Sequence, residues 1–379
     1  MFEKVKVLYF VDRLLIGGIQ TFILNNIKHI DREKVQIDFL ILDDGNVYDA
    51  EKQLADEGYN IYRLKGIWVN RITDYLKYSK SLDEFFSKHC DYKVIHYHSS
   101  SKNFLVMKKA KKYGIPVRIA HSHSIDFQTN NYLKKVLGNI FKIFLVKNST
   151  DFFACSENAG KWLFGENITK TEKFHIVHNA VDIEKFKYNE EKRNQIRKQL
   201  GIANDTIVYG HVGRLNPEKN HKFLIGLFKL INEEQENSKL LLLGTGKLEN
   251  ELKAKVNELD LSDKVIFAGF VDNVNEYMSA MDVFIFPSTF EGLGLVLIEA
   301  QANGLKCYAS KNAVPNEAKV SEQLEFIELD KGQKYWAEHI LKSKNDRCDV
   351  CKAIEKSGYK IENMCKYLES FYTSNENSI

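Results

Sequence analysis

Proline, cysteine and long apolar runs are scarce in this sequence, and each scarcity excludes a class of protein. The chain has 379 residues with only 4 Pro and 44% hydrophobic residues, which excludes a proline-rich disordered chain. Its 6 Cys are too few for a disulfide framework in a chain of this length, and we interpret Cys348 and Cys351 as ordinary reduced thiols. No run of about 18 apolar residues occurs, and the first residues carry no signal-peptide apolar region. We therefore expect a folded cytoplasmic protein.

An excess of charge of one sign is also lacking. The chain has 54 Lys+Arg and 51 Asp+Glu, a formal net charge of +3, which excludes a histone-like basic protein. The total conceals one basic segment, because residues 101–150 contain ten Lys/Arg and a single acid, Asp126, for a net charge of +9. The remaining residues are therefore net acidic, and the function has to account for this segment.

Short apolar runs alternate with amphipathic stretches along the chain. Such alternation predicts parallel sheets covered by helices on both faces, and the length suits two doubly wound domains. The domains are predicted at 1–188 and 189–350, with a C-terminal helix in 351–379 that could pack back on the first domain. The charged run 189–194 is interpreted as the solvated seam between them. The predicted strands are 6–11, 36–42, 93–98, 117–121, 151–154, 174–177, 206–212, 239–243, 264–268, 282–286 and 306–309, and the clearest helices are 20–30, 221–235 and 248–259.

Glycines separate the first predicted strand from the first helix. Gly17 and Gly18 would present bare backbone N–H groups at the positive end of a helix, which suits a phosphate or a closely approaching sugar. A tight turn that needs a positive φ explains them equally well. The pattern is not GxGxxG, which argues against a standard dinucleotide site.

Two cations follow the first strand of the second domain. That strand ends at Gly213, and Arg214 and Lys219 lie in the loop after it. Ligands of open α/β sheets bind at the carboxyl ends of strands, and an Arg fork together with a Lys point charge can grip a pyrophosphate. A solvated basic loop is the alternative.

A glycine-bearing loop also follows the buried strand 282–286. It leads into an apolar helix, whose N-terminal amides would face a diphosphate. Glu291 lies in this loop and Glu299 lies two turns into the helix, flanked by apolar residues. A carboxylate beside phosphate is costly, so these side chains make sense if they face hydroxyls or a developing cation. The amides in question belong to Gly292, Leu293, Gly294 and Leu295.

Taken together, Glu291-x7-Glu299, Arg214-x4-Lys219 and Gly17-Gly18 resemble the retaining glycosyltransferases of family 4, which have the GT-B fold. Residues 178–182 resemble the linker motif Pro-Asn-Gly-Val-Asp of that family, with His178 and Ala180 as departures. The segment 268–271 resembles the stretch near the nucleotide base. Three further segments resemble a subgroup of bacterial exopolysaccharide and capsule enzymes: 121–124, 154–157 and 299–304.

The resemblance implies a role for each matching residue. Arg214 and Lys219 would hold the donor diphosphate with the amides of 292–295, and Val271 would lie near the base. Glu299 would accept hydrogen bonds from the ribose hydroxyls, and Glu291 would contact the transferred sugar. The resemblance also implies that the two domains face a central cleft. Gly17 and Gly18 of the first domain would close this cleft, and His121 of the same domain would face the reacting centre.

The same resemblance implies a metal-independent hexosyltransferase that uses front-face displacement. Cations and helix N-termini can stabilise the charge that develops on the leaving diphosphate without a metal ion. The acidic pair Asp43-Asp44 follows a predicted strand of the first domain, and we interpret it as a turn rather than a metal site. No covalent nucleophile is evident, and His98, His121 and His123 are candidate proton-handling groups.

The basic segment contains a helix pattern in which lysines interleave with an apolar stripe over 132–145. Such a helix can lie on an anionic membrane, although a core-facing helix with solvated lysines is the commoner outcome. Acceptors in the resembled subgroup are typically sugars on undecaprenyl diphosphate. We therefore expect peripheral contact of 101–148 with the inner face of the cell membrane.

Two alternatives to a glycosyltransferase remain open. A sugar-nucleotide epimerase on the same fold would act without an acceptor. A nucleic-acid-binding protein would use the basic patch, but the patch lacks the aromatic platforms and motif spacing of known readers. We expect no nucleic-acid partner. The sequence does not identify the sugar; UDP is the expected nucleotide, with GDP next.

Overall fold

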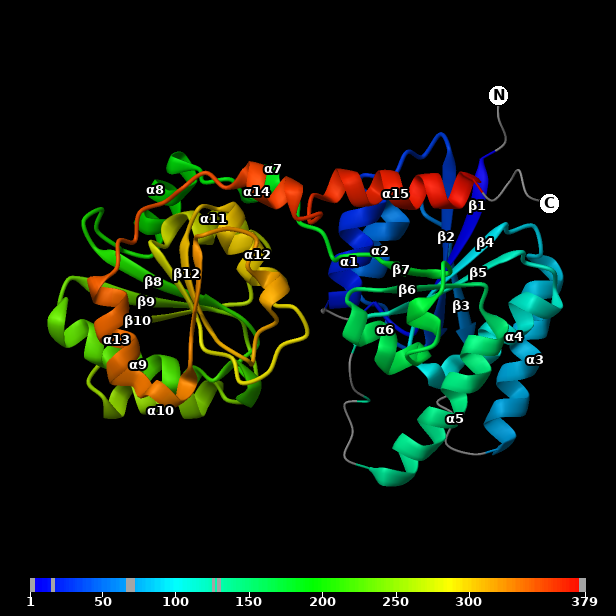
Figure 1. Cartoon of the computed structure of the whole chain (residues 1–379), viewed down its shortest axis with the longest axis horizontal. Helices are drawn as coiled ribbons and strands as arrows, with labels where there is room; N and C mark the ends of the chain where they lie inside the picture. The colour runs from blue at the N-terminus through cyan, green and yellow to red at the C-terminus, as the bar shows by residue number, and fades with distance from the viewer. Residues whose placement is uncertain (1–3, 15–17, 66–71, 125–126, 128–130, 375–379) are drawn as a thin grey trace. The chain divides into compact units, whose positions relative to one another are not determined.

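The computed structural model describes residues 4–14, 18–65, 72–124, 127 and 131–374. The chain divides into two compact units, which are treated separately. The first unit comprises residues 1–180 and 361–379, and the second comprises residues 181–360 (Figure 1).

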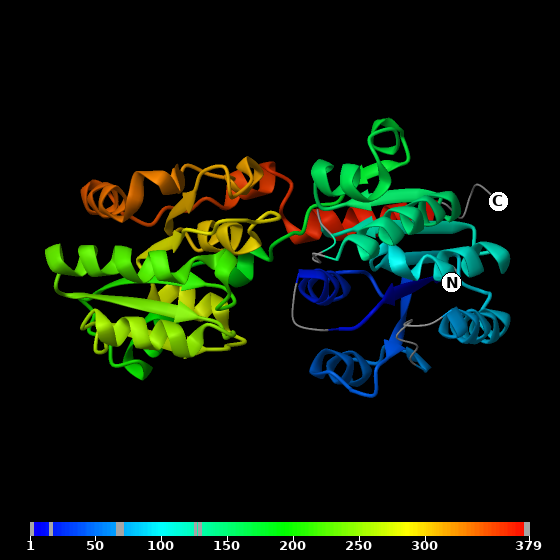
Figure 2. The same cartoon turned by 90° about the horizontal axis from the view of Figure 1, so that it is seen from below.

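The first unit is built on a parallel sheet in the order β3-β2-β1-β4-β5-β6-β7. Helices cover both faces (Figure 2), because side chains alternate along the strands and both alternating sets are apolar. α1, α2 and α15 pack on one face, and α3, α4, α5 and α6 on the other. The strands are β1 Val5–Val11, β2 Val35–Asp43, β3 Ile61–Lys65, β4 Val94–His98, β5 Val117–Ser122, β6 Asp151–Ala154 and β7 Phe174–Ile176. The helices are α1 Gly18–Ile27, α2 Asp49–Asp56, α3 Ile72–Lys88, α4 Leu105–Lys112, α5 Tyr132–Asn148, α6 Glu157–Phe164 and α15 Ile361–Ser374, with 3₁₀ turns η1 Ser101–Asn103 and η2 Ile168–Lys170.

The second unit repeats this plan in the order β10-β9-β8-β11-β12-β13, again with parallel pairing. α7, α8, α11, α12 and α14 pack on one face, and α9, α10 and α13 on the other. The strands are β8 Ile207–Val212, β9 Ser238–Leu243, β10 Val265–Gly269, β11 Val283–Phe286, β12 Lys306–Ser310 and β13 Leu324–Ile327. The helices are α7 Ile183–Phe186, α8 Glu190–Gln199, α9 His221–Glu234, α10 Glu249–Glu258, α11 Val274–Ala280, α12 Leu295–Ala302, α13 Gly332–Lys342 and α14 Cys351–Lys356, with 3₁₀ turns η3 Pro217–Lys219, η4 Asn316–Ala318 and η5 Leu329–Lys331.

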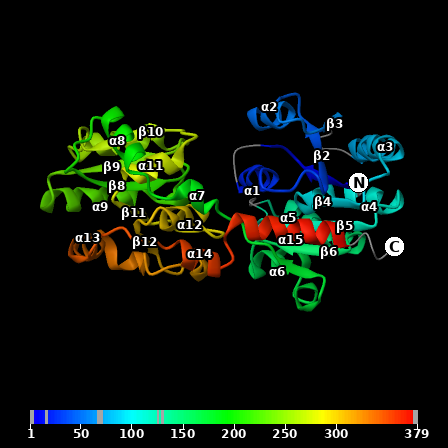
Figure 3. The same cartoon turned by 90° about the horizontal axis from the view of Figure 1, so that it is seen from above.

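The unit boundaries differ from the predicted breaks after residues 188 and 350. The backbone N–H of Val181 donates to the carbonyl of Tyr359 at 2.8 Å, which binds the start of the second unit to its end. Ile183 and Phe186 of α7 are buried in the second core. Residues 351–360 also belong to the second unit, and the predicted single C-terminal helix is two helices separated at 357–360. Only α15 lies along the first unit (Figure 3).

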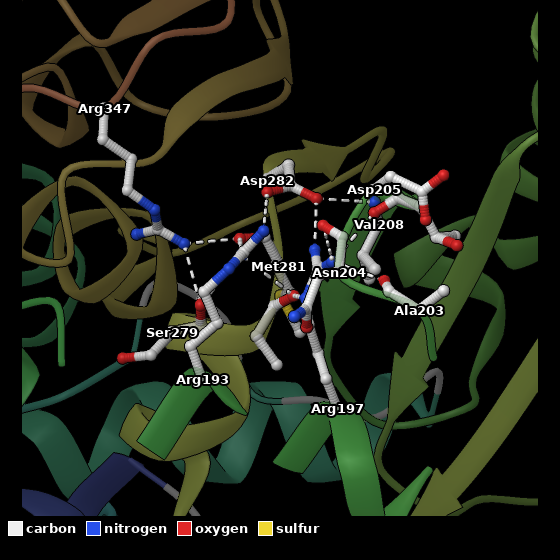
Figure 4. A network of polar contacts seen from close by, with 12 residues as sticks. Arg193, Arg197, Ala203, Asn204, Asp205, Val208, Ser279, Met281, Asp282 and Arg347 are labelled. Atoms are coloured by element: carbon white, nitrogen blue, oxygen red, sulfur yellow. Dashed lines mark hydrogen bonds and ion pairs between the residues drawn. The ribbon is translucent and has the colours of Figure 1, made fainter. Parts of the chain in front are cut away.

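The predicted seam at 189–194 is mostly exposed, as expected, but it is no boundary between domains, because it lies within the second unit in α8, whose arginines are anchored. Arg197 is 1% exposed and donates to Asp282 at 2.6 Å, and Arg193 donates to the same carboxylate at 2.8 Å. Arg347 donates to carbonyls at the end of α11, which include that of Ser279 (Figure 4). Arg193 and Arg197 therefore fasten α8 to Asp282, the residue before β11, and Arg347 fastens the segment after α13 to the end of α11.

Within the described residues, no helix is long and apolar enough to cross a membrane.

Candidate functional site

The loops with the predicted donor-site residues follow β8 and β11, two strands that pair at the middle of the second sheet. The chain order of the strands reverses between them, since β9 and β10 lie on one side and β12 and β13 on the other. This reversal is the topological switch point, beside which open α/β sheets bind ligands at the carboxyl ends of their strands. The fold thus brings together two loops that are about seventy residues apart in sequence.

The two loops are bonded to each other. The N–H of Thr289 donates to the carbonyl of Glu218 at 2.8 Å, and Asn220 Nδ2 donates to the carbonyl of Pro287 at 3.1 Å. The N–H of Glu291 donates to the carbonyl of Ala313 at 2.9 Å, which fixes the second loop from its other side. The loop backbones are therefore set before any ligand arrives.

Lys219 and Glu291 are in direct contact. Lys219 Nζ lies 2.5 Å from Glu291 Oε1, and the side chains are only 19% and 11% exposed. The ammonium also lies 4.6 Å from the centroid of the Phe286 ring. The cation and the carboxylate hold each other in place at the switch point. A ligand there would meet both a positive charge and a carboxylate that can accept hydrogen bonds from hydroxyl groups.

Arg214 is arranged differently. Its side chain is exposed, and among the described residues no carboxylate pairs with its guanidinium. It lies one residue beyond Gly213, whose N–H donates to the carbonyl of Leu243 at 2.9 Å. The guanidinium is therefore available to an anion at this edge of the sheet.

The amides of Gly292, Leu293, Gly294 and Leu295 donate to no acceptor among the described residues. Gly294 precedes α12 with φ 79°, a left-handed conformation that glycine adopts without strain. A Cβ at Gly292 would meet nothing within 4 Å, so this loop has open space beside its free amides. Free N–H groups at the start of a helix can bind an anion, and this role of the four amides stays a prediction.

Glu299 is half-buried in α12, and burial raises its pKa to about 7, while Lys185 of α7 opposes the rise. No described side chain donates a hydrogen bond to its carboxylate. Such a group changes protonation near neutral pH and can accept hydrogen bonds from a ligand once it is ionised. Val271 follows β10 and packs partly against the same core.

Two features of this edge were missed from the sequence. Gly244 and Gly246, after β9, lie against the Arg214 loop so closely that a Cβ at Gly244 would lie 2.1 Å from the carbonyl oxygen of Gly213. His211 and His221 lie nearby with ring centroids 4.7 Å apart, and both are buried. The run Leu-Gly-Thr-Gly after an apolar strand was the available signal for the glycines; nothing in the sequence pairs the two histidines.

The predicted first-unit residues are less uniform. Gly17 lies outside the described residues, and Gly18 begins α1. His121 is the second-last residue of β5, lies within a cluster of four histidines and is 1% exposed. Burial lowers its pKa well below the usual range of histidine. The expectation that it faces a donor sugar stays a prediction, and contact with a sugar requires the ring to become accessible.

The other acidic candidate forms the turn that we inferred. Asp43 Oδ1 accepts from the N–H of Gly45 at 3.0 Å, and Asp44 Oδ1 accepts from that of Asn46 at 3.0 Å. Asp43 also pairs with Arg63 at 2.7 Å. Both carboxylates are thus engaged in local structure.

The basic segment separates into anchored and free cations. Lys109 and Lys112 pair with Asp83 of α3, and Arg118 donates to three backbone carbonyls, so these cations support the fold. In α5, Lys134, Lys135 and Lys147 form no ion pair with a described residue. The apolar side chains of α5 do not form a core-facing stripe, since most of them are exposed: Tyr132, Leu133, Val136, Leu137, Ile140, Ile143 and Phe144.

Comparison with known families gives matches over both units. Residues 16–185 match the family described as Glycosyltransferase Family 4, and residues 192–361 match the family described as Glycosyl transferases group 1. These two matches account for most of the chain.

Individual relatives match over most of their length. The putative glycosyltransferase EpsF of Bacillus subtilis is 29% identical over 89% of this chain and 87% of its own. The UDP-Gal:alpha-D-GlcNAc-diphosphoundecaprenol alpha-1,3-galactosyltransferase of Escherichia coli is 27% identical over 86% and 85%. The capsular polysaccharide biosynthesis glycosyltransferase CapM of Staphylococcus aureus is 28% identical over 68% and 70%. These names give no support to the epimerase alternative.

Among solved structures, HepE of Anabaena in complex with UDP-glucose matches 99% of this chain and 100% of its own. Its TM-score is 0.69 at 18% sequence identity, which supports the GT-B fold.

Proposed function

Because the chain belongs to the family 4 glycosyltransferases and has the GT-B fold, we propose that it is a retaining hexosyltransferase that uses a UDP-sugar. The acceptor in this proposal is a glycan on undecaprenyl diphosphate, in exopolysaccharide or capsule assembly. The name of the Escherichia coli relative states such an acceptor and a UDP donor, and the name of the Staphylococcus aureus relative states capsular polysaccharide biosynthesis.

The observation that carries the proposal is the group of charges at the switch point of the second sheet. The contacting pair Lys219 and Glu291, the exposed Arg214 and the free amides of 292–295 share two bonded loops. A nucleoside diphosphate sugar offers a dianionic diphosphate for the cations and amides, and sugar hydroxyls for the carboxylate.

This arrangement supports departure of the diphosphate without a metal ion. Cleavage of the sugar–phosphate bond increases negative charge on the diphosphate, which Lys219, Arg214 and the amides of 292–295 stabilise because they are already in place. The ring carbon becomes electron-poor, and the Glu291 carboxylate stabilises that charge while it orients a hydroxyl group. In a front-face displacement the leaving phosphate oxygen accepts the proton of the attacking hydroxyl, so no covalent intermediate on the enzyme forms.

Glu299 and Val271 complete the nucleotide end of the proposed site. The Glu299 carboxylate accepts hydrogen bonds from the ribose hydroxyls, which its lack of a donor within the described residues supports. Val271 supplies apolar contact near the base.

The proposed acceptor also accounts for the basic segment. Helix α5 exposes apolar side chains together with Lys134 and Lys147, and Lys135 is half-buried beside them; exposed apolar groups and lysines are the combination that holds a helix at an anionic membrane interface. We place the enzyme peripherally at the membrane through this helix, where a lipid-linked acceptor resides.

The test is a calorimetric and thermal-shift screen of the full chain with UDP, GDP and their sugars. UDP is expected to bind near one equivalent and to raise the unfolding temperature in a concentration-dependent way. Incubation of the bound UDP-sugar with and without lipid-linked acceptor follows. Transfer only with the acceptor supports the proposal. Isomerised sugar from the donor alone, or absence of binding by every nucleotide, contradicts it.

A further inference from the structure

Four histidine rings form a compact buried cluster at the carboxyl ends of β4 and β5. His96 and His98 lie on β4, His121 is the second-last residue of β5 and His123 follows that strand. Ring centroids are 4.1 Å apart for His96 and His98, 4.0 Å for His121 and His123, and 5.2 Å for His98 and His121. The rings of Phe22 in α1 and Phe153 in β6 pack against this cluster.

The hydrogen bonds inside the cluster do not use all of its ring nitrogens. His96 Nε2 bonds to His121 Nδ1 at 3.0 Å, and His98 Nδ1 bonds to His123 Nε2 at 2.9 Å. Three buried nitrogens then have no partner among the described residues: His98 Nε2, His121 Nε2 and His123 Nδ1.

At least one unused lone pair remains in the cluster, whichever ring nitrogens carry the hydrogens. A neutral imidazole has one N–H and one lone pair, so whichever ring of the His98–His123 pair donates, one leftover nitrogen keeps an unused lone pair. Buried polar atoms without partners are rare in folded proteins because burial removes their hydrogen bonds to water. When His98 Nδ1–H donates to His123, the free lone pair belongs to His98 Nε2, and this lone pair is open to a ligand of the cluster.

We propose that His96, His98 and His121 bind a zinc-class transition metal ion. One ring nitrogen from each residue lies within 4.8 Å of those of the other two. Imidazole nitrogens bind zinc at about 2.0–2.1 Å, so two of them on one tetrahedral ion lie about 3.3–3.4 Å apart. His96 Nε2 and His121 Nδ1 are 3.0 Å apart, so a shift of a few tenths of an ångström exchanges their hydrogen bond for two metal bonds.

The surroundings orient the rings for this task. The Tyr372 hydroxyl lies 2.6 Å from His96 Nδ1, and it bonds in turn to the Tyr9 hydroxyl at 2.8 Å. When His96 Nδ1–H donates to Tyr372 Oη and His98 Nδ1–H donates to His123 Nε2, the Nε2 lone pairs of His96 and His98 are free for the ion. Metal-binding histidines use their second nitrogen in this way, and loss of such a partner lowers metal affinity about 10–100-fold.

The proposed ion has a structural role. It joins β4 and β5 and, through Tyr372, α15 from the end of the chain. Three histidines leave one tetrahedral position for a water molecule. No carboxylate contacts the rings within the described part of the chain, so loss of a proton from that water reduces the buried charge. This site uses none of the donor-site residues of the second unit, but it includes His121, so an ion bound there excludes the predicted contact of that ring with the donor sugar.

The experiment uses the full chain after treatment with a chelator and its removal. Zn²⁺ alone is titrated by calorimetry and thermal shift, and Co²⁺ alone by visible absorption. One equivalent is expected to bind and to raise the unfolding temperature, and the cobalt spectrum is expected to show nitrogen ligands without a thiolate charge-transfer band. No binding near one equivalent overturns the proposal. A thiolate band that disappears in Cys351→Ser also overturns it, because the metal is then at Cys348 and Cys351.

Variants locate the site. His98→Gln is expected to lose the one-equivalent binding, and Tyr372→Phe, which keeps the ring shape, is expected to weaken it at least tenfold. Tyr78→Phe is the matched control, because this buried hydroxyl of the same unit lies in the other core cluster. Unchanged affinity in Tyr372→Phe overturns the proposal even if His98→Gln does not fold. Retention of UDP binding in each variant shows that the second unit remains folded.

Discussion

The two sheets present opposite chemistry at corresponding edges. At the switch point of the second sheet, Arg214 is exposed, four loop amides are free, and Lys219 contacts Glu291 beside open space. At the carboxyl ends of β4 and β5 in the first sheet, the polar groups are histidine rings buried under Phe22. One edge is built to meet an anion from water, and the other holds neutral nitrogen atoms away from water.

The distribution of net charge along the sequence would instead suggest that an anion binds to the first unit. The sequence concentrates its positive charge in the first unit, at 101–150, yet several of those cations are fastened to Asp83 or to backbone carbonyls. The proposed donor site of the second unit uses only two cations, Arg214 and Lys219, whose positions at the switch point matter more than their number. The proposed donor site therefore rests on the carboxyl edge of a sheet, where open α/β sheets bind ligands, and not on net charge.

The largest effect is expected from breaking the Lys219–Glu291 pair. Lys219→Ala and Glu291→Ala should each lower kcat/KM by about 10²–10³, because each removes a preorganised charge from the transition state. Lys222→Ala is the control, since Lys222 lies nearby in α9 but pairs at the surface with Glu251. Steady-state transfer to a lipid-linked acceptor is the measurement, with circular dichroism to verify the fold. Full activity in both variants would sink the site assignment.

The free lysines of α5 test the other half of the comparison. Lys134→Ala combined with Lys135→Ala should weaken binding to anionic vesicles about 30-fold, since each lysine near such a surface contributes about 1 kcal/mol. UDP affinity should not change. The double variant Lys253→Ala, Lys255→Ala in α10 removes the same charge from the second unit and should bind vesicles normally. Co-sedimentation with phosphatidylglycerol vesicles decides; an equal loss of UDP affinity contradicts the division of roles.

Substitutions of Arg214 test whether its guanidinium binds the diphosphate through two parallel hydrogen bonds or only through its charge. Arg214→Ala is expected to weaken UDP binding about tenfold, and Arg214→Lys to recover part of the loss, because lysine keeps the charge but not the bidentate geometry. Calorimetry at two salt concentrations measures the effect. If both variants bind UDP as tightly as the native protein, the guanidinium does not contact the diphosphate.

The smallest expected effect concerns the pH dependence of UDP binding. Burial raises the pKa of Glu299 to about 7, so its carboxylate form is lost as pH falls through 7. Between pH 8 and pH 6, the affinity of the native protein for UDP should therefore fall severalfold more than the affinity of Glu299→Gln. The variant is the control, because UDP itself titrates in the same way with both proteins. Identical pH profiles would show that Glu299 is not a ribose acceptor.

The same shift predicts an effect on stability with the opposite sense. The folded state holds the Glu299 proton more tightly than the unfolded chain, so stability falls as pH rises from about 4.5 to 7. Glu299→Gln lacks this loss and should be more stable than the native protein at pH 8 without ligand, by roughly 1–3 kcal/mol. Thermal unfolding at pH 5 and pH 8 provides the check: an unchanged stability difference between the two proteins contradicts the shift.

Most of the fold follows from local pattern. All eleven predicted strands lie within one residue of those observed, because buried parallel strands are nearly continuous apolar runs. β3 and β13 were missed: both are edge strands of four or five residues with charged side chains. The domain boundary was wrongly predicted at 189–194 because the anchoring of α8 depends on Asp282, about ninety residues away, which no local pattern reveals.

The residues of the candidate donor site could be selected from the sequence, but the contacts between them could not. Strand ends, glycines and cations marked the two loops, and the family resemblance supplied their roles. The contact between Lys219 and Glu291 depends on the pairing of β8 with β11, which is a property of the whole sheet. The histidine cluster similarly depends on the pairing of β4 with β5 and on Tyr372, near the end of the chain.

Hydrogen exchange of the full chain with and without UDP tests the central claim most directly, because it locates the bound nucleotide on the sequence. UDP is predicted to slow exchange at 213–220 and 291–299, where the free amides and the bonded loops lie, and to leave the α5 residues 132–148 unchanged. Protection confined to 132–148, with none at 291–299, would contradict the assignment of the donor site to the second unit.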